Sequence, residues 1–238
     1  NLREAMHTPA SKTEKPPVIT IDGPSGSGKG AITHKLAQKL GFHILDSGAL
    51  YRLIGLAARK SQTSFDDEPG LARISREMVV KFVPSDDPEE PLHILLEGEE
   101  VTKSLRTDQA GQDASRVAPI AAVRAGIGEL QRGFLTAPGL IADGRDMGTV
   151  VFPDADVKIY LTASAEIRAN RRYKQLKDKD ISVTLPGLFQ SIKDRDERDM
   201  NREVAPLRPA IDAVVVDSSL MSLDEVFEAV IAIVREKV

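Results

Sequence analysis

The stretch that decides the fold is Gly23-Pro24-Ser25-Gly26-Ser27-Gly28-Lys29-Gly30, which matches the pattern G-x-x-x-x-G-K. It follows residues 18–21, a β-branched run that predicts a buried strand, and precedes helically spaced apolar residues from Ile32 to Leu40. In that context the glycines let backbone N–H groups converge on phosphate oxygens, and the lysine reaches the terminal phosphates. A glycine-rich turn with a chance lysine is the alternative, but it leaves the strand before and the helix after unexplained. The stretch therefore predicts a phosphate-binding loop.

The positions after the lysine depart from the usual form of this loop. Ser or Thr normally follows the lysine, where its hydroxyl binds Mg²⁺, whereas this chain has Gly30 and then Ala31. A loop without that hydroxyl either holds Mg²⁺ through phosphates and water or recruits another oxygen. The sequence thus predicts phosphate binding and leaves the metal ligands open.

Short apolar runs alternate with helical spacing along most of the chain. Strands are expected at residues 43–45, 140–142, 157–161 and 213–216, and helices at residues 49–60 and 223–234. This order predicts an α/β fold, in which a parallel sheet of the P-loop NTPase type is flanked by helices.

Residues 78–105 interrupt that alternation. Short strands without helices, at residues 79–83, at residues 93–96 and around Val101, predict a small antiparallel insertion. We expect residues 18–77 and 106–238 to form the core, with a helical lid at about residues 168–187. Residues 1–17 are polar and lack the apolar segment of a signal peptide, so we expect a disordered leader or a tag remnant.

The composition limits the kinds of partner. The net charge is −4 and the chain has no Trp, which argues against a broad nucleic-acid-binding surface or an aromatic stacking platform. Cysteine is absent, which excludes disulfides and thiolate metal sites, and the four histidines show no metal-ligand spacing. No apolar run approaches the roughly 20 residues of a membrane helix. We expect a cytoplasmic monomer that binds neither nucleic acid nor membrane.

Two polar segments follow predicted strands. They are expected to face the phosphate-binding loop, because open α/β sheets bind ligands at the carboxyl ends of their strands. In residues 46–52, Ser47 either contacts a ligand or caps the next helix, and Tyr51 and Arg52 point either into the same cleft or to solvent. In residues 143–146, two carboxylates flank an arginine, which suits a ligand site, while a plain turn is the alternative.

Residues 188–202 predict a helix whose inward face changes character. Leu188 and Ile192 lie on one face, and the same spacing continues to Arg195, Asp199 and Arg202. A helix whose apolar face continues into charged residues is suited to line a cleft that binds an anion. An exposed ladder of Arg/Asp pairs is the alternative.

A basic segment lies upstream of this helix. Arg168, Arg171 and Arg172 precede a polar stretch at residues 173–185. That stretch is interpreted either as a mobile segment that closes over phosphates and excludes water or as part of an ordinary basic helix.

Phosphoryl transfer between two bound ligands requires positioning and charge neutralisation, and it requires no protein nucleophile. The segments above supply a donor loop, a polar acceptor set and an arginine-rich helix. Residues 20–30, 45–52, 141–153 and 195–202 resemble motifs of bacterial cytidylate kinases, and the likeness runs from about Val18 to the C-terminus. The resemblance implies a kinase that moves the γ-phosphoryl group of ATP, with Mg²⁺ as cofactor, onto CMP or dCMP.

The resemblance also implies roles for single residues. The base is read by Ser115, Arg124 and Asp146, and the ribose is contacted by Ser47 and Asp199, with Tyr51 in the same pocket. The acceptor phosphate is held by Arg52, Arg145, Arg195 and Arg202, with Asp143 close to it. ATP is bound by residues 23–31 and Arg171, and the catalytic groups are Lys29, Asp143, Arg145, Arg195 and Arg202. The family usually has Thr at position 31, so Ala31 predicts weaker binding or turnover of ATP·Mg²⁺.

Two other readings remain open from the sequence. A kinase of the same fold for UMP, AMP, dTMP or shikimate is the nearest, because fold alone does not separate these acceptors. A non-catalytic nucleotide switch or binding module is the reading from another class. A guanine-specific switch would need an Asn-Lys-x-Asp motif, which this chain lacks.

Overall fold

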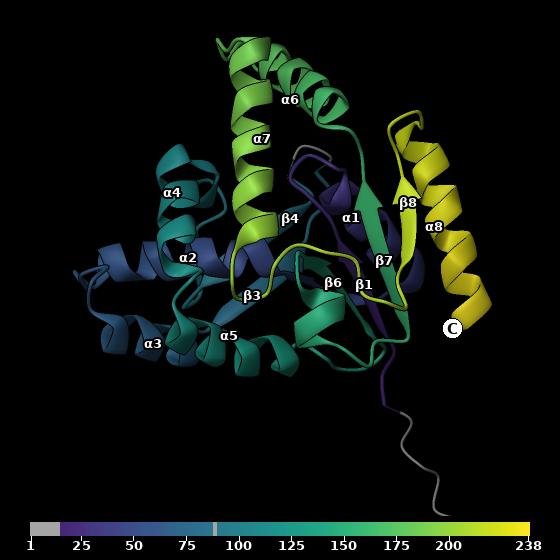
Figure 1. The fold of residues 1–238 in the computed structure, drawn as a ribbon. Coiled ribbons are helices and arrows are strands. Elements are labelled where there is room, and N and C mark those ends of the chain that lie inside the picture. The colour runs from purple at the N-terminus through teal and green to yellow at the C-terminus, as the bar shows by residue number, and fades with distance from the viewer. Residues whose placement is uncertain (1–14, 88–89) are drawn as a thin grey trace, which may run out of the picture.

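The computed structural model describes residues 15–87 and 90–238 (Figure 1). Its centre is a five-stranded parallel sheet in the order β2-β6-β1-β7-β8. The strands are β1 (Val18–Asp22), β2 (His43–Asp46), β6 (Leu140–Gly144), β7 (Val157–Thr162) and β8 (Val214–Asp217). This confirms the predicted α/β class. Residues 1–14, most of the expected leader, lie outside the described residues.

Helices cover both faces of the sheet because its central strands are apolar on both sides. In β1, Ile19 and Ile21 pack against α1 (Lys29–Leu40) and α8 (Leu223–Lys237), whereas Val18 joins the core on the opposite face. That second core contains α2 (Ser47–Lys60), α3 (Glu68–Glu77), α4 (Asp108–Val117) and α5 (Ala121–Gly133). The two cores fix the carboxyl ends of β1, β2 and β6 at one edge of the molecule.

The insertion is a second, antiparallel sheet, as predicted. It contains β3 (Val80–Pro84), β4 (Leu92–Leu96) and β5 (Glu99–Glu100), in that order. The third strand ends just before Val101, whose buried side chain packs into the core that contains α2. The short helix η1 (Ser104–Arg106) then leads the chain back to α4.

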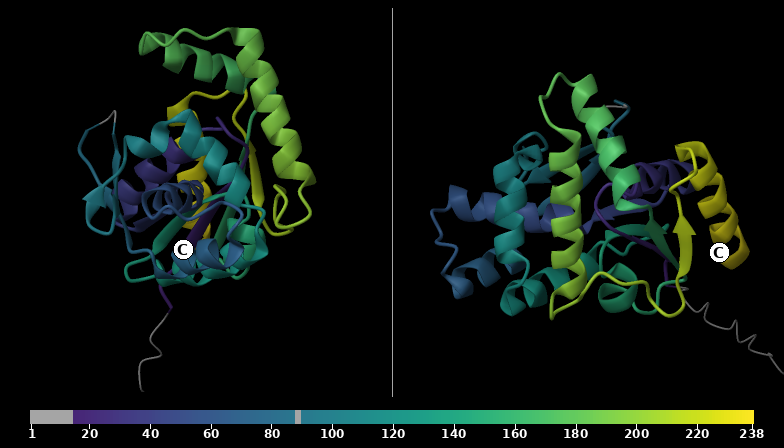
Figure 2. Two further views of the ribbon diagram at one scale, coloured as in Figure 1. Left: turned by 90° about the vertical axis from the view of Figure 1, so that its left-hand side faces the viewer. Right: turned by 45° about the horizontal axis from the view of Figure 1, so that its top comes forward.

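A helical hairpin stands over the carboxyl end of β7 (Figures 1 and 2). It is formed by α6 (Ala165–Asp178) and α7 (Leu185–Asn201), which pack against each other. The side chains of Ser164 and Thr184 cap the two helices. Residues 173–178 continue α6, which agrees with the interpretation of this stretch as part of a basic helix. One expectation differs from the structure: Arg202 was expected within the next helix but follows the end of α7 with extended backbone. No helix within residues 15–87 and 90–238 has the length and apolar character to cross a membrane.

Candidate active site

The loop between β1 and α1 has the backbone that a phosphate-binding loop needs. Gly26 and Gly28 have φ angles of 76° and 93°, a left-handed region that favours glycine. Gly23 lies so close to β7 that a Cβ atom there would sit 2.0 Å from the carbonyl oxygen of Leu161. Gly28 occupies the N-cap position and has no side chain to cap α1, so the positive end of the helix faces the loop.

Lys29, at the start of α1, lies among buried charges. Its Nζ donates to the carbonyl oxygen of Pro24 at 3.0 Å, which folds the side chain back over the loop. Burial and repulsion by the nearby cation Arg145 together lower the pKa of Lys29 to about 8, whereas Asp143 opposes the shift. An anionic ligand at this position would restore the full charge of the lysine.

Two buried carboxylates lie at the ends of neighbouring strands. Burial raises the pKa of Asp143 to about 7, and Asp46, its partner in the β2–β6 register, adds to the shift. Burial also raises the pKa of Asp22 to about 6, although its carboxylate accepts hydrogen bonds from the N–H groups of Met147 and Gly148 at 2.9 and 2.8 Å. Those bonds fix η2 (Met147–Val151), a π-helical turn, against β1. Sequence reasoning gave Asp22 no role.

The arginines expected to hold a phosphate lie together beneath α7. Arg145 donates its Nε–H to the carboxylate of Asp199, and the Nη1 atom of Arg195 lies 3.4 Å from the Ser25 hydroxyl in the loop. Burial lowers the pKa of Arg195 to about 10, and repulsion by Arg145 contributes. Burial and the neighbouring Arg124 also lower the pKa of Arg202. Buried guanidinium groups that destabilise one another suit a site for a polyanion.

A second cluster joins α2, α5 and the end of β6. The Nη1 atom of Arg124 donates to Asp146 at 3.3 Å, and both side chains are largely buried. The same guanidinium lies 5.4 Å from the centre of the Tyr51 ring. Burial raises the pKa of Tyr51 to about 12, so this phenol stays neutral at physiological pH. The cluster therefore offers both donors and a carboxylate acceptor to a ligand.

Other predicted residues have partners elsewhere in this structure. Ser115 is exposed on α4 and donates to the carbonyl oxygen of Gly111 at 3.2 Å, and Arg52 donates to Leu105 at 2.7 Å. Arg171 donates to the carbonyl oxygen of Ser218 at 2.6 Å, beside β8. Arg52 nevertheless lies near Arg195, whose pKa it helps to lower. The structure thus brings together Lys29, Arg52, Asp143, Arg145, Arg195, Asp199 and Arg202, with the Arg124–Asp146 pair next to them.

Ser47 does not cap α2. The N-cap is Asp46, whose carboxylate accepts the Ala49 N–H at 3.1 Å, so the interpretation of Ser47 as a capping residue was wrong. The Ser47 side chain is buried, and its hydroxyl accepts from Gln131 at 3.4 Å. Capping of α2 therefore does not explain why position 47 carries a hydroxyl group.

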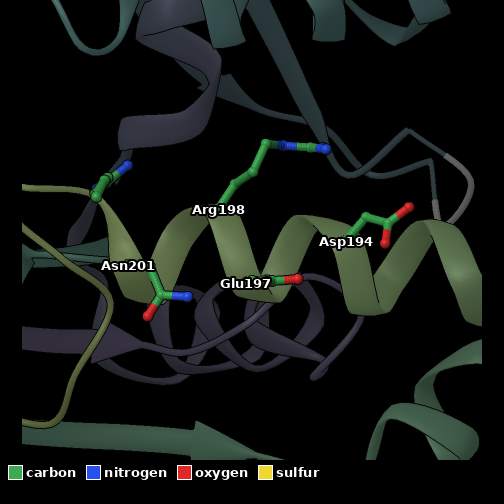
Figure 3. A pocket seen from close by; sticks show the side chains of 5 residues that line it. Asp194, Glu197, Arg198 and Asn201 are labelled. Carbon is green, nitrogen blue, oxygen red and sulfur yellow. The ribbon is translucent and has the colours of Figure 1, made fainter.

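A hollow of about 460 Å³ runs along α7 to Arg202. Its lining side chains come from one stretch of chain: Asp194, Glu197, Arg198, Asn201 and Arg202. In Figure 3, Asp194 and Arg198 project to the same side of the helix. Arg198 also contributes to the repulsion that lowers the pKa of Arg195, so positive charge extends from the hollow to the arginine cluster.

Oxygen ligands for a cation are present beside the loop. Asp22, Asp46 and Asp143 supply carboxylates at adjacent strand ends, and Mg²⁺ prefers such oxygens. Across residues 15–87 and 90–238, the one set of three His or acidic ligand atoms within 4.8 Å is elsewhere, at Glu90, His93 and Glu100. The chemistry of the Asp22, Asp46 and Asp143 carboxylates therefore fits a hard divalent cation at the loop.

Comparisons with known proteins place the chain in a family. The sequence model of the family described as "Cytidylate kinase" matches residues 19–236. A cytidylate kinase of Shewanella putrefaciens (strain CN-32) is 52% identical over 225 residues, which cover 94% of this chain and 97% of that protein. A cytidylate kinase of Aeromonas hydrophila is 52% identical over 221 residues, covering 93% and 95%. Among solved structures, a gluconokinase of Sinorhizobium meliloti matches with a TM-score of 0.46 and 14% identity, covering 93% of this chain and 94% of that one. On the family match and these relatives, the chain belongs to the cytidylate kinase family.

Proposed function

We propose that the protein transfers the γ-phosphoryl group of ATP to CMP or dCMP and releases ADP with CDP or dCDP. Family membership supports the reaction. The structural observation that carries the proposal is that acceptor-side cations meet the donor loop: Arg195 contacts Ser25 at 3.4 Å, and Arg145 and Asp199 lie in the same cluster.

The donor half of the proposed site is residues 23–31. Backbone N–H groups of the loop and of the first turn of α1 bind the β- and γ-phosphates, and Lys29 neutralises them. Asp22 and Asp143 are the carboxylates that would hold Mg²⁺ through its water ligands, and the ion would neutralise charge between the β- and γ-phosphates. Arg171 is the further ATP contact that we propose, after release from Ser218.

The acceptor half is proposed to read three parts of the nucleotide. Arg124 and Asp146, together with Ser115, bind the base, because a carboxylate accepts from the exocyclic amine of cytosine and rejects the carbonyl of uracil. Ser47 and Asp199 bind the ribose, next to Tyr51. The phosphate is held by four guanidinium groups, those of Arg52, Arg145, Arg195 and Arg202.

In the proposed reaction an oxygen of the acceptor phosphate attacks the γ-phosphorus in line with the leaving ADP oxygen. Such a transition state is loose and spreads negative charge over the equatorial oxygens of the transferring group. Lys29, Arg145 and Arg195 supply fixed positive charge there, and the protein forms no covalent intermediate. The α6–α7 hairpin is proposed to close over the phosphates and to exclude water, which competes with the acceptor.

The test is ATP consumption by the purified protein with Mg²⁺ and, in parallel, CMP, dCMP, UMP, AMP or dTMP. The proposal expects turnover with CMP and dCMP far above that with the others. Equal turnover with UMP would instead support a broader pyrimidine kinase. ATP binding without turnover for any acceptor would support a binding module.

A further inference from the structure

Arg168, near the start of α6, is a charged residue with almost no exposure to solvent. Its relative exposure is 3%, and its guanidinium contacts three different segments of the chain. The Nε–H donates to the carbonyl oxygen of Ala163 at 2.9 Å, and Nη1 donates to the carbonyl oxygen of Ser25 at 3.0 Å. Nη1 and Nη2 also donate to the two carboxylate oxygens of Asp196, at 2.9 and 2.5 Å.

A buried pair of this kind needs an explanation other than stability. The desolvation of two charges offsets most of their attraction, and well-packed apolar residues often give equal or greater stability. The Arg168–Asp196 pair is bidentate, and its guanidinium has further acceptors in two backbone carbonyls, so its geometry is fixed on every side. The Arg168–Asp196 pair therefore fixes the chain segments that it contacts relative to one another. The identity of those segments indicates what the pair is for.

One of those elements is the phosphate-binding loop. A trans peptide directs its C=O and N–H groups in opposite directions, so a carbonyl of Ser25 that is held by Arg168 turns the N–H of Gly26 away from Arg168. Gly26 also packs on the aliphatic stem of Arg168, because a Cβ at Gly26 would lie 3.4 Å from the Arg168 Cβ. Arg168 thereby fixes the orientation of one peptide in the loop.

The other element is α7. Asp196 directly follows Arg195 and lies one turn before Asp199, so it shares a helix with residues of the acceptor half. Arg195 itself contacts the hydroxyl of Ser25, at 3.4 Å. The same loop residue is therefore tied to α7 twice, through its hydroxyl by Arg195 and through its carbonyl by the Arg168–Asp196 pair.

We propose that Arg168 and Asp196 are positioning residues that hold the donor loop and α7 at the separation that phosphoryl transfer requires. The inference rests on the proposed function, since it assigns the pair to that reaction. Neither side chain needs to touch a substrate. Loss of the pair would leave both half-sites present but misaligned, and a misplacement of about 1 Å at a reacting centre costs on the order of 100-fold in rate.

The variants are Arg168→Lys, Asp196→Asn and the double variant. Lysine keeps the charge but makes no bidentate contact, and asparagine keeps the shape but loses the charge. With saturating ATP and CMP, kcat is expected to fall by about 10- to 100-fold in each single variant, while KM for either substrate changes less than about threefold. The double variant should lose little more than a single one, because the two side chains act as a unit.

The matched control is Arg59→Lys. Arg59 forms the other bidentate Arg–Asp pair among the described residues that joins two helices, with Asp113, at 2.5 and 2.9 Å between α2 and α4. Because the Arg59 side chain is about half exposed, its replacement is expected to lower the melting temperature by less than the replacement of Arg168 and to keep kcat within about twofold.

The wild-type and variant results test the proposed function and the positioning role of Arg168 and Asp196 separately. If the wild-type protein does not phosphorylate CMP, the proposed function fails. If the wild type is active and the folded Arg168→Lys and Asp196→Asn proteins keep kcat within about twofold of it, the pair is merely structural and the inference is wrong. Asp196→Asn alone decides the question if Arg168→Lys does not fold.

Discussion

Arg145, just after β6, donates its Nε–H to the carboxylate of Asp199 on α7, so two residues assigned to different parts of the acceptor neutralise each other in this structure. A phosphate bound by Arg145 would compete with that carboxylate. Asp199 would then turn to the ribose hydroxyls. We infer that the acceptor exchanges this ion pair for two contacts of its own, one to its phosphate and one to its sugar.

This exchange predicts how the sugar is discriminated. Asp199→Asn should lower kcat/KM for CMP by about 10-fold more than for dCMP, because a hydrogen bond from a hydroxyl to a charged group contributes about 1.5–3 kcal/mol. Parallel kinetics with both nucleotides measure the ratio. Asp194→Asn, an exposed carboxylate on the same helix that pairs with Gln190, is the control and should leave the ratio unchanged. An equal loss for both nucleotides in Asp199→Asn would remove the ribose assignment.

The Arg124–Asp146 pair predicts the choice of base. Asp146→Asn should lower kcat/KM for CMP by about 100-fold or more and narrow the gap to UMP, because the amide can donate to the uracil carbonyl while the carboxylate cannot. The two acceptors are compared at fixed ATP. Glu129→Gln neutralises an exposed carboxylate on the same helix as Arg124 and serves as the control. An unchanged CMP-to-UMP ratio would place base recognition elsewhere.

The missing hydroxyl at position 31 predicts a gain of function. Ala31 is exposed in the first turn of α1, beside the loop, so a threonine there would present its hydroxyl to bound phosphate or to water on the metal. Ala31→Thr is expected to lower KM for ATP by about fivefold, as one added hydrogen bond of about 1 kcal/mol would do. Ala31→Val matches its shape without the hydroxyl. Identical constants for the two variants would show that the hydroxyl is irrelevant here.

The raised pKa of Asp143 leads to a prediction that replacing this residue stabilises the protein in a pH-dependent way and lowers its activity. Its folded pKa of about 7 lies above the ordinary 3.8, so the folded protein keeps a proton that the unfolded chain has lost between these values. The free energy of unfolding therefore falls as pH rises from about 4 to 7 and is level above that. Asp143→Asn has no carboxyl group to ionise, so it avoids this loss of unfolding free energy. The melting temperature of the variant minus that of the wild type should therefore grow from pH 5 to pH 7 and then remain constant, while kcat falls.

Melting curves at pH 5, 7 and 8 for both proteins test this account of Asp143. A destabilised Asp143→Asn protein at pH 8, or one whose gain does not vary with pH, would show that the pKa of Asp143 is not raised in the folded protein.

The sheet was predictable because its signals are local. The β-branched run of residues 18–21 and the glycine pattern that follows fix a strand, a loop and a helix within one short segment. The helices α3, α4 and α5 were not predicted. The sequence of α4, with few apolar residues and an internal Gly111, gives a weak helical signal, and the helix depends on its Thr107 cap and on packing against α2.

The sequence predicted several of the side chains that lie together beside the loop, but it did not predict the contacts that they make. Arg168 read as one cation of a basic segment, yet its buried partners, Ser25 and Asp196, lie 143 and 28 residues away in sequence. Sequence spacing cannot report a partner at that separation. Asp22 was overlooked for the same reason, since its hydrogen bonds reach Met147 and Gly148 across the sheet.

The most direct test of the central claim is to follow the labelled γ-phosphate of ATP in the presence of CMP and Mg²⁺. The account predicts that the label appears in CDP, in equal amount to the ADP formed, and that little inorganic phosphate is released. Label found only in inorganic phosphate, or retained in ATP although both nucleotides bind, would contradict it.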